Sequence, residues 1–505
     1  EPPVTVEPGR AQLRLLSGAE YRATVEDLLG LTASPGLGHA DRVAGYDTGA
    51  NGQLDENLHA ALVAEAERLG DAYAAGRLRA DFPCFDPGNL TGACVETIVR
   101  ELGRRVFRRP VPPDTRDALL AFYDEAAAIT RDESAAAGLL VARMLASPQF
   151  LYRSEVGRDG AHDAEERASL VAYVVTGSTP DELLLRDAEN DLLDGPRLGL
   201  HVERLLDSPR GRARLTSFFQ AWLKASALDA MAERPDGFPK LSALEQGPAL
   251  RDELAAFVQG VVLGGEGTLP ALLSSSVGYV NRHTAPLYGL SGVDSDALVR
   301  VALDPAERRG VLTLASTLSA HGSIADPARD RPVKRGLMVF DRLLCGEVGA
   351  PSGINTAAAS SEAAGRVADF DALTTREQYD AMMEQGQECK SCHAKFMPIG
   401  YAFGGYDALG RRVTEHRGRA IDTRVELSFG TFDGALAVND ALVAQPSTAR
   451  CFTRNLVAFA SGASQGRHVD ELSWAMGDRF LAGGQNIKAL LRDLLSGPHL
   501  YRRAR

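Results

Sequence analysis

The sequence predicts a mainly α-helical protein built from several domains. The chain has 505 residues, a length typical of about three domains of roughly 150 residues each. Leu- and Ala-rich segments repeat their apolar side chains at intervals close to 3.6 residues, as amphipathic helices packed on one another do. Strand-like alternation is confined mainly to residues 417–432. We therefore expect a helical body with one short β-hairpin-like segment.

Helices are expected wherever this periodicity runs between loops that contain Pro and Gly. The clearest examples are residues 13–29, 95–107, 113–129, 133–146 and 168–175. In the strand-like segment, alternation with polar residues involves Ile421, Val425, Leu427 and Phe429.

Two stretches have the composition of linkers, residues 158–166 and residues 346–368. The second is rich in Ala, Ser and Gly and has few large apolar side chains, which is typical of a flexible connection. We predict three domains: an N-terminal helical domain at residues 1–160, a middle helical domain at 161–300, and a third domain at 301–505.

Charge and hydropathy exclude several classes of function. Acidic residues number 67 and basic residues 55, so the formal net charge is −12. This balance argues against nucleic acid or an anionic membrane surface as the partner. No apolar stretch is long enough to span a bilayer, and the overall composition is that of a soluble globular protein.

The cysteines indicate an oxidising compartment. Cys84 and Cys94 flank a segment rich in turn-forming residues, so they are expected to form a disulfide. Cys345 and Cys451 are the weaker second pair. The chain also begins Glu-Pro-Pro without Met, as a mature N-terminus does after an export signal is removed. We expect a periplasmic or extracellular protein.

The strongest chemical motif is Cys389-Lys-Ser-Cys392-His393, a C-x-x-C-H sequence. This is the attachment signature of a c-type haem: two thiols form thioethers with the porphyrin, and the adjacent imidazole reaches the iron. A zinc site would need a further pair of ligands, which the nearby sequence does not offer. A thioredoxin-like redox pair would need a βαβ setting, and a plain disulfide across two residues is strained. The motif predicts one covalently attached haem c.

His393 is expected to be the proximal iron ligand, so a distal ligand must come from the other porphyrin face. Met397 lies only four residues from His393 and precedes Pro398, which favours the proximal side. His416 is our first candidate for the distal ligand. The other candidates are Met382, Met383, His468 and Met476, and a five-coordinate iron with an open face remains an alternative.

Asp47, Asn51 and Asp55 have the spacing of a loose calcium site, although the loop does not fit an EF-hand. A capped turn before a helix that begins at Glu56 is the favoured interpretation. No phosphate-binding loop or zinc-protease motif occurs in the chain.

Segments along nearly the whole chain resemble a large group of exported planctomycete and myxobacterial proteins of unknown function that carry a cytochrome-c-like haem site. Besides the C-x-x-C-H motif, the resemblance rests on residues 15–21, 27–30, 107–110, 147–153, 219–223, 279–282, 288–290, 331–336, 341–345, 398–403, 406–411 and 451–454. It implies export, a single haem c and a multi-part helical body. The family usually has an aspartate where Met397 precedes Pro398, so any role of that aspartate is not carried over.

The motif and the resemblance together imply that the third domain is a haem c module with a C-terminal helical region. A simple cytochrome needs only about 100 residues, so the rest of the chain is expected to recognise a redox partner or a substrate, neither identified. We expect an electron-transfer protein or oxidoreductase, with peroxidase-like chemistry if the distal face is open. The alternative is a structural or surface-binding protein in which haem is mainly a structural staple.

Overall fold

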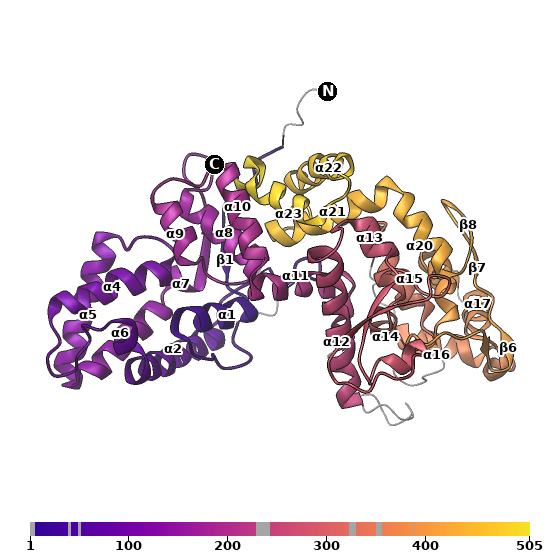
Figure 1. Cartoon of the computed structure of the whole chain (residues 1–505), viewed down its shortest axis with the longest axis horizontal. Coiled ribbons are helices and arrows are strands. Elements are labelled where there is room, and N and C mark those ends of the chain that lie inside the picture. The colour runs from indigo at the N-terminus through magenta and orange to yellow at the C-terminus, as the bar shows by residue number, and fades with distance from the viewer. Residues whose placement is uncertain are drawn as a thin grey trace. The chain divides into compact units, whose positions relative to one another are not determined.

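The computed structural model describes residues 6–38, 42–48, 52–228, 243–322, 330–349, 356–385 and 387–504, with the backbone alone at 227, 243–246, 356, 357 and 387–389. The fold is mainly α-helical, as predicted, and its β structure within these ranges consists of short two-stranded antiparallel sheets (Figure 1). None of the described helices is both long and apolar enough to cross a membrane.

The chain divides into two compact units. The first unit comprises Glu1–Leu215, Leu456–Ala475 and Leu491–Arg505, and the second comprises Thr216–Asn455 and Met476–Leu490. The C-terminal helices thus contribute to both units. The sequence-based boundaries near residues 160 and 300 stay a prediction.

The first unit is built mainly from the N-terminal half of the chain. Its elements, with the helix that leads into the second unit, are β1 Gln12–Leu15, α1 Gly18–Leu29, α2 Glu56–Gly76, α3 Leu78–Asp81, α4 Gly92–Phe107, α5 Pro113–Thr130, α6 Glu133–Leu145, α7 Pro148–Leu151, β2 Tyr152–Glu155, α8 Ala164–Thr176, α9 Glu182–Glu189, α10 Gly195–Leu206 and α11 Pro209–Trp222.

Helices α2 and α6 pack with their backbones in close approach. A Cβ atom on Gly70 of α2 would lie 2.2 Å from the carbonyl oxygen of Gly138 in α6. No side chain fits between the two helices at this crossing, so glycine is required there. Around the crossing lies a core of buried apolar residues that includes Leu69, Tyr73 and Val141.

The start of the expected helix at residues 13–29 is instead strand β1, and α1 begins only at Gly18 behind the capping box of Ser17 and Glu20. Strand β1 pairs antiparallel with the distant strand β2. At this pairing the buried Arg14 Nη1 lies 2.8 Å from Glu155 Oε1. The helix prediction for residues 13–17 was wrong, because the strand depends on a pairing partner far along the chain.

The second unit contains the C-x-x-C-H motif. Its elements, with those of the shared C-terminal region, are η1 Ala225–Leu228, α12 Ala243–Val258, the π-helix η3 Gln259–Leu263, α13 Leu269–Ser274, β3 Val277–Val280, η4 Ala285–Tyr288, β4 Val299–Ala302, η5 Val311–Thr313, α14 Ala315–Ala320, α15 Pro332–Arg342, α16 Thr356–Gly365, η6 Phe370–Ala372, α17 Thr375–Gln385, α18 Gln387–His393, α19 Met397–Ala402, η7 Phe403–Gly405, β5 Glu415–His416, β6 Arg419–Ala420, β7 Arg424–Leu427, β8 Gly430–Asp433, α20 Gly434–Ala444, α21 Pro446–Ser461, α22 Arg467–Ala482, α23 Ile487–Ser496 and η8 Pro498–Tyr501.

The predicted β segment is present as two small hairpins, β5–β6 and β7–β8, with registers that pair Glu415 with Ala420 and Arg424 with Asp433. The linker-like stretch at residues 346–368 contains a helix, α16. Its run of Ala residues explains the difference, since Ala has the highest helix propensity even where few large apolar side chains are available for packing.

Both cysteine pairs that the sequence suggested are bonded. Cys84 and Cys94 have Cα atoms 5.7 Å apart, and Cys345 and Cys451 have Cα atoms 5.4 Å apart. The second bond joins the chain just after α15 to helix α21. It closes a sequence separation of 106 residues, against 10 for the first.

Candidate haem-binding segment

The C-x-x-C-H motif lies on α18, between helices α17 and α19. Positions 389 and 392 are three residues apart on the helical backbone, which is nearly one turn. Cys392 is a free thiol and is partly exposed. Its sulfur is therefore available for a thioether bond.

His393 is the last residue of α18 and is half-buried. Its Nδ1 atom lies 3.4 Å from the sulfur of Met397, and its ring contacts that of Phe396 at a centroid distance of 5.3 Å. Because a thioether sulfur can only accept, Nδ1 carries the proton in this contact. Burial lowers the pKa of His393, which favours the neutral ring.

The neutral tautomer with the proton on Nδ1 leaves a lone pair on Nε2. Within the described part of the chain, this atom has no hydrogen-bond partner. Metal-binding histidines commonly use one ring nitrogen for the metal while the other donates a hydrogen bond that fixes the tautomer. The donor set of Cys392 and His393 therefore fits a covalently attached haem, with Met397 on the same side as His393.

Helix α19, which carries Met397, is held directly against α15. A Cβ atom on Gly400 would lie 1.9 Å from the carbonyl oxygen of Pro332, and one on Gly336 would lie 2.1 Å from that of Phe396. The two helices therefore cross with their backbones in contact, which requires glycine at both positions. Residues 331–336 and 398–403, two of the segments that carry the family resemblance, meet at this crossing.

Arg335 of α15 extends this scaffold to the next segment. Its side chain is buried, and Nη1 donates to the carbonyl oxygens of Phe403 at 3.0 Å and Tyr406 at 2.6 Å, while Nη2 donates to that of Asp407 at 2.5 Å. A planar guanidinium is suited to this, since it has five donors in a fixed arrangement. No sequence pattern distinguishes Arg335, although it lies within the segment 331–336 that carries the family resemblance.

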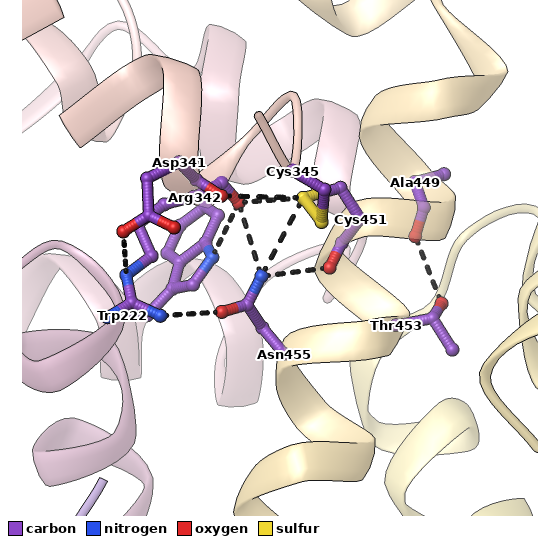
Figure 2. The surroundings of a disulfide bond; sticks show 8 residues. All are labelled: Trp222, Asp341, Arg342, Cys345, Ala449, Cys451, Thr453 and Asn455. Carbon is purple, nitrogen blue, oxygen red and sulfur yellow. Dashed lines mark hydrogen bonds and ion pairs between the residues drawn. A yellow bond between two sulfur atoms is a disulfide. The ribbon is translucent and has the colours of Figure 1, made fainter. Parts of the chain in front are cut away.

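The C-terminal end of α15 is fixed beside the Cys345–Cys451 disulfide (Figure 2). The carbonyl oxygen of Arg342 accepts from Trp222 Nε1 at 3.1 Å, and Arg342 Nη1 donates to Asn455 Oδ1 at 2.9 Å. Asn455 Nδ2 also donates to the carbonyl oxygen of Cys451 at 2.9 Å. The end of α15 and the residues just after it are thus tied to α21 by hydrogen bonds and by a disulfide.

His416 has the opposite hydrogen-bonding arrangement from His393. It is buried in β5, and its Nδ1 accepts from the backbone N–H of Thr375 at 3.1 Å. Thr375 is the first residue of α17, so this N–H is one of the donors that a helix leaves unpaired at its start. Since Nδ1 accepts, the neutral ring of His416 carries its proton on Nε2.

The cavity beside His416 has a volume of about 20 Å³, which is room for about one water molecule. In this arrangement His416 accepts a hydrogen bond from the first residue of α17. Its assignment as the distal iron ligand stays a prediction, and binding through Nε2 would first require that nitrogen to lose its proton.

The other distal candidates lie in different places. Met382 is buried and Met383 half-buried on α17, and Met476 is buried in the second unit. His468 belongs to the first unit, where its Nδ1 donates to the carbonyl oxygen of Glu7. Among the described side chains, no three His, Cys, Asp or Glu residues group as a bare metal ion would need. The distal ligand is not assigned.

In the candidate calcium loop, Asp47 and Asp55 both accept hydrogen bonds from other residues of the protein. Asp47 Oδ2 accepts from the hydroxyl of Ser17 at 2.8 Å, and Asp55 Oδ1 accepts from the backbone N–H of Leu58 at 2.8 Å. Asp55 is the N-cap of α2, which begins at Glu56. Asn51 lies outside the described residues. The capped-turn interpretation accounts for Asp55.

Three segments of the chain match known family models. Residues 94–155 match PSD5, a protein of unknown function (DUF1595), and residues 163–290 match PSD4, a protein of unknown function (DUF1592). Residues 308–416 match PSCyt3, a protein of unknown function (DUF1588), and this match contains the C-x-x-C-H motif. Neither a curated protein nor a solved structure matches the chain.

Proposed function

We propose that the chain is an exported mono-haem c protein that transfers electrons to or from a redox partner or substrate. Cys389 and Cys392 would form the two thioethers, and His393 would hold the iron through Nε2. The observation that carries the proposal is the complete C-x-x-C-H motif inside the segment that matches PSCyt3. When bound, haem supplies a one-electron redox centre.

The residues around the motif have distinct tasks in this proposal. Met397 orients the imidazole of His393 by accepting from Nδ1, as the second shell of a metal site does. Helix α15 supports α19, and Arg335 holds the chain that follows α19. This support would keep the imidazole of His393 in one orientation, which an electron-transfer site needs if little reorganisation is to accompany each transfer.

The proposed location is the periplasm or the extracellular space. The two disulfides support it, because such bonds persist in oxidising compartments. Attachment of haem to a C-x-x-C-H motif also requires both cysteines as reduced thiols at the moment of reaction, and Cys392 is not engaged in a disulfide.

Covalent attachment is tested by producing the full chain together with a haem c maturation system. We expect an intact mass increased by one haem and a pyridine haemochrome spectrum of the c type. Cys392→Ser should lose one thioether and shift the haemochrome band. Lys390→Ala, at an exposed position between the two cysteines, is the matched control and should retain the haem. Wild-type protein without covalent haem would refute the proposal.

Electron transfer is tested separately by a potentiometric titration of the haem-loaded protein with small-molecule mediators. We expect one reversible single-electron transition. A haem that does not exchange electrons with any mediator would contradict the redox role and favour the structural staple. Turnover of added peroxide would instead indicate an open distal face.

A further inference from the structure

The first unit contains a cavity that the haem proposal does not use. Its volume is about 290 Å³, which approaches the lower end of the range for small-molecule sites. Most of the surface that lines it is apolar, and its apolar and aromatic side chains are Leu13, Phe107, Pro148 and Tyr152. Leu13 is 58% exposed, so the cavity can be reached from solvent. By comparison, an apolar cavity of about 150 Å³ holds one benzene ring.

Two segments quoted for the family resemblance meet in this cavity. Residues 107–110 contribute Phe107, Arg108 and Arg109, and residues 147–153 contribute Pro148, Gln149 and Tyr152. The first segment ends α4 and the second forms α7 and the start of β2. Strand β1 contributes Leu13, and helix α8 contributes Glu165, Glu166 and Ser169.

Ser169 of α8 lines the cavity and lacks a hydrogen-bond partner. It is 6% exposed, and its hydroxyl oxygen is buried without a partner in the described part of the protein. A buried hydroxyl in this state is unfavourable, and native structures leave few of them. A ligand atom that hydrogen-bonds to Ser169 would remove this penalty.

Two other polar side chains in the lining, Arg108 and Glu166, are already hydrogen-bonded to neighbouring residues of the protein. The guanidinium of Arg108 donates to three backbone carbonyl oxygens, those of Gln149, Phe150 and Tyr152, at 2.7, 3.0 and 2.7 Å. Glu166 accepts from the hydroxyl of Ser154 at 2.6 Å and completes the capping box of α8. These contacts fix the shape of the cavity and leave neither group for a ligand.

Arg109 is only weakly engaged. Its Nη2 lies 3.4 Å from the nearer carboxylate oxygen of Asp163, which is long for a charge-assisted hydrogen bond. Polar side chains of the lining that the wall contacts leave for a ligand include Ser169, Arg109, Gln149 and Glu165. The charges of Arg108 and Arg109 are balanced by those of Glu165 and Glu166, so the site does not favour a charged molecule.

The geometry points to a binding site in this cavity for an uncharged, mainly apolar organic molecule of about two rings that carries one hydrogen-bonding oxygen. The rings lie against Phe107, Pro148 and Tyr152, and the oxygen contacts the hydroxyl of Ser169. The site does not depend on the haem proposal, because all of its residues belong to the first unit.

The test is calorimetric titration of the purified full chain with 2-naphthol at pH 7. We expect saturable binding of one molecule. Naphthalene, which lacks the oxygen, should bind about tenfold more weakly because one hydrogen bond is lost. The anion 2-naphthoate should also bind more weakly. Tighter binding of 2-naphthoate would overturn the uncharged class, and no saturable binding of 2-naphthol would overturn the site.

Two variants connect the binding to the cavity. Ser169→Ala should weaken 2-naphthol about tenfold and leave naphthalene unchanged, whereas Ser169→Leu should fill the space and reduce binding of both. Ser134→Ala, on α6 outside the lining, is the matched control. Circular dichroism verifies that each variant is folded. Equal affinities in the Ser169 variants and the control would refute the assignment.

Discussion

His393 and His416 lie in the same unit but are prepared by their surroundings for different roles. Nδ1 of His393 faces the sulfur of Met397, which can only accept, whereas Nδ1 of His416 accepts from the backbone N–H of Thr375. His393 therefore presents an unprotonated Nε2, and His416 carries its proton there in the neutral form. The comparison shows that the ring nitrogen an imidazole leaves unprotonated depends on the contact that the other nitrogen makes.

The two histidines also differ in the part of the fold that positions them. His393 ends a short helix next to α19, which packs on the anchored helix α15. His416 lies in a two-residue strand and is held by the start of α17. Each of the following variants changes the surroundings of one of these two histidines or the histidine itself.

The largest effect is expected from His393→Ala in the haem-loaded protein. The thioethers can still form, but the axial nitrogen is lost, so the absorption spectrum should change to that of a different ligand set. Intact mass together with visible spectroscopy measures both properties. His59→Ala, at an exposed position on α2 in the first unit, is the control and should leave the spectrum unchanged. A wild-type spectrum in His393→Ala would show that another residue holds the iron.

The disulfide near α15 should matter more for stability than the disulfide in the first unit. In the chain-entropy account, the bond that closes 106 residues contributes about 5 kcal/mol and the bond that closes 10 residues about 3 kcal/mol. Replacing Cys345 and Cys451 by Ala should therefore lower the unfolding temperature more than replacing Cys84 and Cys94. Scanning calorimetry measures both pairs.

Only the Cys345/Cys451 double variant should affect the surroundings of His393, because Cys345 follows the helix that supports α19. The haem spectrum of the Cys84/Cys94 variant is the control. An equal loss of stability in the two double variants would contradict the dependence on loop length.

His416→Ala distinguishes the two interpretations of the second histidine. If His416 only serves the start of α17, the haem spectrum stays unchanged and unfolding becomes easier by about 1–3 kcal/mol, since the Thr375 N–H loses its partner. His416→Gln, which retains an acceptor, should recover part of this loss. Conversion of a low-spin spectrum to high spin in His416→Ala would establish His416 as the distal ligand, as the sequence predicted.

Features that depend on neighbours along the chain could be predicted from the sequence. The C-x-x-C-H motif, the Cys84–Cys94 pair and the hairpins after residue 414 are of this kind. The hydrogen bond that His416 receives joins residues 41 positions apart, and β1 pairs with a strand more than 130 residues away. No local pattern encodes such partners, so the tautomers of the two histidines required the structure.

The smallest effect tests the contact that distinguishes His393 from His416. In Met397→Leu the side chain remains apolar and similar in volume, but Nδ1 of His393 loses its acceptor. A hydrogen bond from Nδ1 makes the imidazole a stronger electron donor and stabilises ferric iron, so its loss should raise the midpoint potential. A thioether is a weak acceptor, and a difference of about 0.5 kcal/mol corresponds to about 20 mV for one electron. Potentiometric titration of the variant beside the control Met144→Leu, on α6 of the first unit, measures the shift. A lower potential, or the same shift in both variants, would mean that Met397 does not orient His393 through this contact.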